Sequence, residues 1–403
     1  MIPELLAPAG NLEKLKVAVL YGADAVYLGG RHYGLRAGAG NFSAEEMVEG
    51  VRFAREKGVR VYVTINIFAH NRDLEPLPAY LDAICAAGVD GVIVSDPGIA
   101  DLVKRLQPEL PLHLSTQANT TNWASARFWK ERGISRIILA RELSLEEIKQ
   151  IRDQVGVELE VFVHGAMCIA YSGRCLLSNY LTGRDANRGD CAQSCRWKYS
   201  LVEEKRPGEF LPVEEDNRGT YILGSRDLCL IEHIPELVRA GVNSFKIEGR
   251  MKSVNYVAGV VKAYREALDA YLRAPDDYRF DPAWMEEINK VSHRRYTTGF
   301  LFGPPGAAGQ HYEGEIYLRS HTFVGLVKSY EQKTGLALVE QRNRFAAGDK
   351  VEIMVPGGHN FKQKVVSIYD QEGNSLVSAP HPRQLVRIPV ERPVVPYSII
   401  RTC

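Results

Sequence analysis

The chain has 403 residues, of which 45% are hydrophobic and 25% charged. These values are ordinary for a soluble globular protein, and the length predicts one large domain with a smaller one. Fifty basic residues against 49 acidic ones give a formal charge of +1, so bulk charge does not indicate nucleic-acid binding, although a local basic patch fits it. The N-terminus lacks a signal-peptide pattern and no apolar run is long enough to cross a membrane, which predicts a cytoplasmic protein without a membrane partner.

The first 250 residues repeat a unit of amphipathic helix, glycine and short β-rich run. Gly58 and Gly88 stand where a helix end needs the left-handed conformation that glycine adopts at low cost. Ser43 with Glu46, and Ser144 with Glu147, fit the capping box of a helix start. The β-rich runs number eight, at residues 4–8, 25–29, 61–66, 91–95, 112–117, 136–141, 158–164 and 244–249.

Alternating strands and helices predict a parallel sheet, because parallel neighbours need a crossover connection. Eight such units predict a (β/α)8 TIM-like barrel, and a doubly wound open sheet is the alternative. The glycine-rich turn GLRAGAGNF, which follows the second strand, lacks the third glycine of the dinucleotide-binding fingerprint. It therefore gives the open, Rossmann-type sheet only weak support.

Changes in the sequence pattern along the chain predict the domain organisation. The barrel is expected over residues 1–275, with a cysteine-rich insertion over 164–230 after the seventh strand. A helical, Gly/Pro-rich linker follows over 276–313. Closely spaced short strands over 314–403 predict a small antiparallel β-barrel domain. In a barrel the insertion leaves the carboxyl end of a strand, which is the face where active sites are built.

The insertion contains four of the seven cysteines, at Cys168, Cys175, Cys191 and Cys195. Their spacing lacks the paired C-x-x-C knuckles of structural zinc and the C-x-x-C of thioredoxin-type redox sites. Four thiolates without histidine partners favour a [4Fe–4S] cluster. Zinc, and thiols that are unligated or joined in disulfides, remain open on spacing alone.

Polar residues at the carboxyl ends of the predicted strands are the next candidates. The catalytic candidates are Asn66, Gln117, His164 and Glu248. The substrate-binding candidates are Arg36, Arg141, Arg226, Lys246 and Arg250. A histidine here would move a proton near the cysteines, and forked guanidinium groups suit carboxylates. A structural interpretation is the alternative for three of these residues. Lys246 and Glu248 point to one side of their strand, and if that side is the interior of the barrel, an ion pair between them would be structural. His164 would likewise be a buried side chain with its hydrogen bonds satisfied.

The stretch ELEVFVHGAMCIAYSGRCLLSNYLTGRDANRGDCAQSCRW, from residue 158 to 197, closely resembles the signature of the collagenase-like peptidase U-32 family. SRDLC at 225–229 and SFKIEGRMKS at 244–253 match other typical stretches, as do APAGN, DAVYLG and LARELS. The resemblance covers essentially the first 300 residues. The terminal β-domain resembles the C-terminal domain of the family, a small barrel similar to those of translation factors.

The resemblance implies oxygen-independent hydroxylation of a tRNA wobble uridine, a 23S ribosomal RNA cytidine or a quinone precursor. Length and the terminal barrel are most similar to the tRNA uridine hydroxylase branch. The family carries a [4Fe–4S] cluster, whose implied ligands are Cys168, Cys175, Cys191 and Cys195. RNA-modifying members take oxygen from prephenate. Because prephenate is a dicarboxylate, we expect arginines to bind it, first Arg141, Arg226 and Arg250, and then Arg36. The implied partners are tRNA, this small-molecule donor and, in some members, a paralogous protein.

The family name keeps a peptidase as the alternative function. The sequence has neither the H-E-x-x-H motif of a zinc protease nor the G-x-S-x-G nucleophile elbow. His164 and Cys168 would form a Cys–His dyad, but four equivalent cysteines favour ligation over one activated nucleophile.

Overall fold

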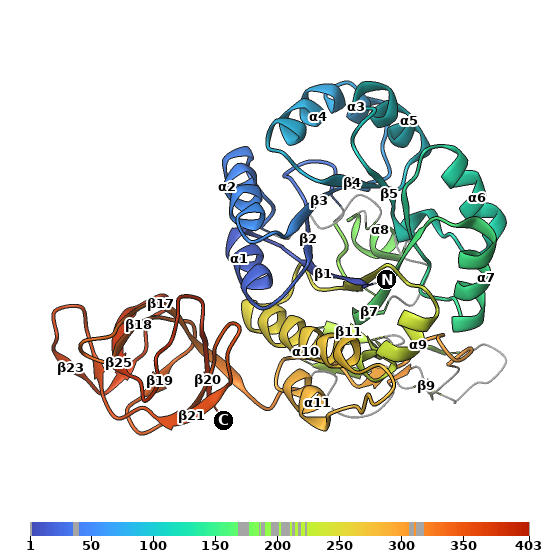
Figure 1. The fold of residues 1–403 in the computed structure, drawn as a ribbon. Coiled ribbons are helices and arrows are strands. Elements are labelled where there is room, and N and C mark those ends of the chain that lie inside the picture. The colour runs from blue at the N-terminus through green and yellow to red at the C-terminus, as the bar shows by residue number, and fades with distance from the viewer. Residues whose placement is uncertain are drawn as a thin grey trace.

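The computed structural model describes residues 2–34, 40–167, 177–184, 186, 190–194, 224–305 and 318–402, with short backbone strands at 201–202, 210–211, 214–216, 219–221 and 310–311. Figure 1 shows a ring of strands surrounded by helices, and beside it a smaller β-domain drawn in orange and red. No helix in these ranges is long and apolar enough to span a membrane.

Eight strands form the wall of the ring. They are β1 (Glu4–Pro8), β2 (Ala25–Leu28), β3 (Arg60–Ile65), β4 (Gly91–Val94), β5 (Leu112–Leu114), β6 (Arg136–Ile138), β7 (Glu158–Ala166) and β14 (Ser244–Ile247). Each pairs in parallel with the next, and β14 closes the ring by pairing with both β1 and β7. This closure confirms the TIM-like barrel and excludes the doubly wound open sheet.

Helices cover the outside of the barrel. They are α1 (Leu12–Leu20), α2 (Ala44–Arg55), α3 (Asn71–Leu74), α4 (Leu77–Ala86), α5 (Pro97–Leu106), α6 (Trp123–Glu131), α7 (Leu145–Val155), α9 (Ile234–Arg239) and α10 (Val254–Arg273), with 3-10 turns η1 (Thr116–Ala118) and η4 (Ile231–His233). The predicted capping boxes form at Ser43 and Ser144. Gly58 and Gly88 have φ angles of 72° and 78°, as their helix ends require.

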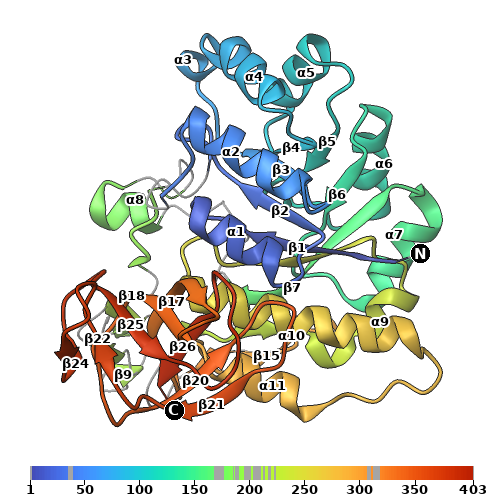
Figure 2. The same cartoon turned by 60° about the vertical axis from the view of Figure 1, so that its left-hand side comes forward.

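The seventh strand is longer than the barrel needs, and its extra residues anchor the segment that follows. Residues 164–166 pair antiparallel with β13 (Asp227–Cys229), which pairs in parallel with β15 (Tyr296–Thr297). The elements between β7 and β13 are α8 (Leu177–Thr182), β8 (Leu201–Val202), β9 (Phe210–Leu211), β10 (Glu214–Asp216), β11 (Gly219–Tyr221) and β12 (Gly224–Ser225), the last paired with β16 (Gln310–His311). In Figure 2, α8 lies on the side of the barrel opposite the N-terminus.

After α10 and α11 (Pro282–Asn289) the chain enters the β-domain, here residues 318–402. Its strands are β17 (Thr322–Glu331), β18 (Leu336–Gln341), β19 (Phe345–Ala346), β20 (Lys350–Met354), β21 (Phe361–Lys364), β22 (Ile368–Tyr369), β23 (Ser375–Leu376), β24 (Ser378–Ala379), β25 (Leu385–Pro389) and β26 (Ile399–Thr402). The paired strands of this sheet run antiparallel, as predicted. Alternate side chains face one hydrophobic core, separate from that of the barrel.

Candidate active site

Arg250, in the turn after β14, is the best-anchored of the predicted substrate-binding residues. Its guanidinium is almost fully buried. Nη1 donates to Thr64 Oγ1 at 3.2 Å, and Nη2 donates to Asn41 Oδ1 at 2.6 Å. Both acceptors are neutral, so these two bonds orient the guanidinium without neutralising it. A guanidinium held in this way suits a carboxylate ligand.

Glycine backbone forms part of the wall around this guanidinium. A Cβ placed on Gly29 would lie 2.2 Å from Arg250 Nη2, and one placed on Gly10 would lie 2.0 Å from the Arg250 carbonyl oxygen. Larger residues at either position would displace the arginine. The Lys14 ammonium donates to the same carbonyl at 3.2 Å, and burial, aided by the charge of Arg250, lowers the pKa of Lys14.

Asn66 and Gln117 come together at the mouth of the barrel. Asn66 follows β3 and Gln117 lies in η1, directly after β5. The Asn66 amide nitrogen donates to Gln117 Oε1 at 3.2 Å, and the Ser115 hydroxyl donates to the same oxygen. Both predicted residues are buried. The sequence placed them on one edge and the structure joins them, while their catalytic role stays a prediction.

Arg141 lies half-buried after β6. Its Nη1 donates to the Ala166 carbonyl at the end of β7, and its guanidinium carbon lies 3.9 Å from the centre of the Phe162 ring. Burial raises the pKa of the neighbouring Glu142 carboxyl. The bond to Ala166 ties the sixth strand to the start of the cysteine-rich segment, so Arg141 occupies the rim of the mouth.

His164 is enclosed by aromatic rings at the end of the barrel part of β7. Its ring lies 5.4–5.9 Å from those of Tyr256, Tyr264 and Tyr296, and the side chain is 1% exposed. Burial lowers its pKa to about 3, although the charge of Asp227 opposes the shift. The imidazole is therefore neutral at physiological pH, and so low a pKa makes it a weak proton acceptor.

Lys246 points into the lower interior of the barrel, away from the mouth. Its ammonium donates to Glu160 Oε1 at 2.7 Å and lies 4.4 Å from the centre of the Tyr27 ring. Arg136 joins the same group by bonding Glu4 at 2.6 Å and Glu160 at 3.4 Å. Lys246 thus forms a structural ion pair inside the barrel, but with Glu160 from the neighbouring strand and not with Glu248.

The remaining predicted residues occupy different surroundings. Glu248 and Arg226 are partly exposed; the Glu248 backbone accepts from the Tyr256 hydroxyl at 2.9 Å, and Arg226 adjoins β13. Arg36 lies outside the described residues.

Cys191 is the one predicted cluster ligand within the described residues, since Cys168, Cys175 and Cys195 lie outside them. Its thiol is exposed, and its Sγ accepts from the Gln193 backbone N–H at 3.4 Å. The Ser178 hydroxyl of α8 accepts from the backbone N–H of Ala192 at 2.9 Å and holds this loop. An accessible sulfur that accepts an N–H bond fits a cluster ligand. Within the described ranges no three metal-binding side chains converge, so the cluster stays a prediction.

Sequence reasoning missed the residues that hold the candidates in place. Thr64 faces the same side of β3 as Asn66 would, and the two-residue spacing was a usable signal. Asn41 adopts a left-handed φ of 47°, which asparagine tolerates better than most residues, but nothing in its neighbourhood indicated an arginine partner. Asp227, which forms a buried ion pair with Arg294 at 2.7 Å, was also missed.

Comparison with known proteins decides the family. The model of peptidase family U32 matches residues 10–311, and that of the family's C-terminal domain matches residues 319–401. The chain belongs to peptidase family U32. It is 46% identical to "tRNA hydroxylation protein P1" of Bacillus subtilis, with 99% of this chain and 94% of that protein covered.

Two further U32 relatives differ in their names. "tRNA hydroxylation protein P" of Escherichia coli is 40% identical, with 96% of this chain and 94% of that protein covered. A protein named "Collagenase" from Porphyromonas gingivalis is 33% identical, with 98% of this chain and 96% of that protein covered. Family membership alone therefore does not select one activity.

Proposed function

We propose that this U32 protein is a tRNA-modifying hydroxylase. Its substrate is the wobble uridine of the anticodon, hydroxylated at C5 without molecular oxygen, and the oxygen donor is prephenate or a similar dicarboxylate. The observation that carries the proposal is the 46% identity to a tRNA hydroxylation protein over 99% of this chain. That similarity spans both the barrel and the β-domain.

The cofactor of the proposed reaction is a [4Fe–4S] cluster held by Cys168, Cys175, Cys191 and Cys195. When bound, it supplies iron–sulfur redox chemistry at the barrel mouth. The chain's own residues bind and orient the reactants. Arg250, fixed by Thr64 and Asn41, binds a donor carboxylate, and the amides of Asn66 and Gln117 offer hydrogen bonds to neutral polar groups.

A peptidase is the second candidate, and the similarity to a collagenase favours it. A cysteine protease needs a base that takes the thiol proton near neutral pH. His164, the predicted base, has a pKa of about 3 and is walled in by tyrosine rings. These surroundings do not suit a histidine that must alternate between its neutral and charged forms, which favours hydroxylation.

Nucleoside mass spectrometry of total tRNA tests the proposal. A strain lacking this protein should lose nucleosides derived from 5-hydroxyuridine, and the wild-type gene should restore them. The Cys191→Ala gene should not restore the nucleosides, and the purified variant should lack iron and sulfide. Cys85→Ala, on α4, is the matched cysteine control: its gene should restore the nucleosides, and the purified variant should contain iron and sulfide. An unchanged nucleoside profile in the deletion strain, with no redundant enzyme present, would overturn the proposal.

A further inference from the structure

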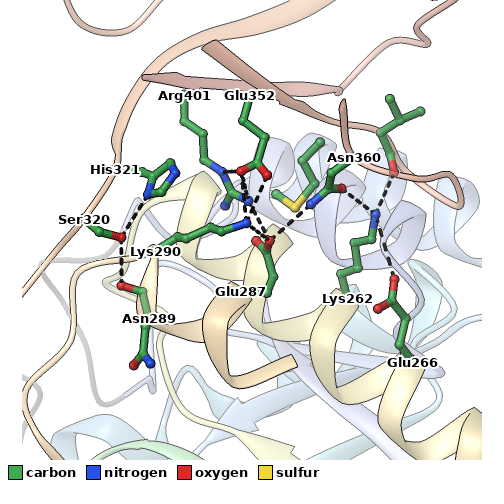
Figure 3. Close-up of polar contacts among 12 residues, drawn as sticks. Lys262, Glu266, Glu287, Asn289, Lys290, Ser320, His321, Glu352, Asn360 and Arg401 are labelled. Atoms are coloured by element: carbon green, nitrogen blue, oxygen red, sulfur yellow. Dashed lines mark hydrogen bonds and ion pairs between the residues drawn. The ribbon is translucent and has the colours of Figure 1, made fainter. Parts of the chain in front are cut away.

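A buried ion network joins the β-domain to the barrel (Figure 3). Arg401 of β26 is fully buried. Its guanidinium bonds Glu287 of α11 at 2.6 Å and Glu352 of β20 at 2.7 Å. Lys290 bridges the same two carboxylates at 3.1 and 3.0 Å. Four charged groups from α11, β20 and β26 thus satisfy one another at the junction, and removing one of them would leave a buried charge unmatched.

Further contacts fix the same junction at other points. The Lys262 ammonium of α10 donates to the Gly358 carbonyl at 2.5 Å and to Asn360 Oδ1 at 2.7 Å. The Tyr21 hydroxyl donates to the Met354 carbonyl at 2.9 Å. The side chain of Met354 packs into the hydrophobic core of the barrel. The β-domain is therefore held in one orientation against α1, α10 and α11.

This orientation brings one end of the β-domain to the rim of the candidate active site. Arg342, directly after β18, forms an ion pair with Glu13 in the first turn of α1. The next residue, Lys14, donates to the carbonyl of Arg250 at 3.2 Å. Adjacent contacts thus connect the β-domain to Arg250, the residue proposed to bind the donor.

Two more arginines lie at this end and point to solvent. The segments 341–346 and 378–384 run side by side, as the Arg383 backbone bond to Gln341 at 3.1 Å and the pairing of Phe345 with Ala379 show. Arg344 and Arg383 are exposed. Neither side chain makes a hydrogen bond or ion pair with another residue in the described part of the chain. Together with Arg342 they form what we call the arginine end.

Positive charge exceeds negative charge at the arginine end. Glu340 serves both Arg342, at 2.8 Å, and Lys328, at 3.4 Å. Arg342 also pairs with Glu13, so these two carboxylates are shared by Arg342 and Lys328, and the charges of Arg344 and Arg383 come in addition. Exposed arginines without carboxylate partners present forked donors that match phosphate oxygens.

We propose that the arginine end binds backbone phosphates of the RNA whose nucleotide enters the barrel mouth. This inference rests on the proposed function. A polynucleotide with one base in the mouth must continue across the rim, and the rigid junction sets Arg344 and Arg383 at a fixed place along its path. Phosphate contacts of this kind position an RNA without reading its sequence.

Salt-dependent tRNA binding by the full-length protein tests the inference. Each phosphate contact contributes about 0.7–0.9 to the slope of log K against log salt. The double variant Arg344→Gln/Arg383→Gln should therefore reduce that slope by about 1.4–1.8. The matched control is Lys362→Gln/Lys364→Gln, which removes the same charge from exposed positions on the edge strand β21. In the sheet, β21 is separated from β18, which leads into the arginine end, by β20, β26 and β17.

The expected result is a smaller slope for the arginine pair and an unchanged slope for the lysine pair, with equal thermal unfolding midpoints. Equal slopes for wild type and the arginine variant, or equal losses in both variants, would overturn the arginine end while leaving the proposed function intact. A wild-type protein with no measurable tRNA binding would overturn both.

Discussion

Charged side chains in the lower interior of the barrel face opposite charges, whereas the buried arginine at the mouth donates two of its bonds to neutral groups. Below, Lys246 and Arg136 bond the carboxylates of Glu160 and Glu4. Above, Arg250 bonds the amide of Asn41 and the hydroxyl of Thr64. In the lower group the opposite charges pair with one another inside the packed barrel. At the mouth, the bonds from Asn41 and Thr64 orient the positively charged guanidinium of Arg250. The difference separates residues that maintain the barrel from residues suited to a ligand.

The largest effect is expected from breaking the lower group. Glu160→Ala leaves Lys246 and part of Arg136 buried without their carboxylate, and removing one partner of such a pair costs about 3–5 kcal/mol of unfolding free energy. Glu158→Ala is the matched control, because Glu158 bonds the same Arg136 at 2.8 Å but is 52% exposed. An exposed pair contributes about 0.2–1 kcal/mol. Denaturant unfolding at neutral pH measures both, and equal losses would contradict the division between the two halves.

The fold was predictable because its signals are local. Eight strands follow from a repeat marked by cap residues, such as Ser43, and by glycine at helix ends, such as Gly88, and a parallel sheet follows from the alternation. The strand β13 was not predicted, because it lies outside the helix–strand repeat and forms by pairing with the extension of β7.

The candidate site was predictable only where position along a strand decides it. Asn66 and Gln117 follow strands that end at one edge, and the structure joins them. The partner of Lys246 was not predictable, because Glu160 lies 86 residues away and no local pattern indicates which side chains meet inside a barrel. Asn41 was missed for the same reason, since its contact with Arg250 spans 209 residues.

A second, smaller effect is expected from His164, which is buried like the lower group but carries no charge. Its pKa of about 3 lies below the ordinary value of 6.5, so the unfolded chain binds a proton that the folded chain does not. Stability from this histidine is complete above pH 6.5 and is lost as the pH falls toward 3. Between pH 7 and 5 the loss amounts to about 2 kcal/mol.

The variant His164→Phe keeps a ring among the tyrosines and removes the titration. Its unfolding free energy should therefore fall by about 2 kcal/mol less than that of the wild type between pH 7 and 5. Denaturant unfolding at three pH values checks this. An identical pH dependence in both proteins would show that His164 takes up a proton as readily in the folded chain as in the unfolded one.

The smallest effect is expected at the mouth, from a methyl group beside Arg250. Gly29→Ala places its Cβ 2.2 Å from Nη2 of that arginine, and the flexible side chain moves aside without unfolding the barrel. Weakening one charge-assisted bond by about 1.4 kcal/mol should raise KM for prephenate about tenfold. KM for tRNA and the unfolding midpoint should change little.

Gly34→Ala is the matched control, because its nearest neighbour, Thr64 Oγ1, is 3.4 Å from the added Cβ and Arg250 is 3.7 Å away. Steady-state kinetics of both variants separate two explanations. If only Gly29→Ala raises KM for prephenate, the orientation of Arg250 governs donor binding and the mouth differs in function from the lower interior. If both variants bind prephenate like the wild type while Glu160→Ala destabilises the barrel, Arg250 is a structural arginine like Arg136, and the donor carboxylates bind elsewhere.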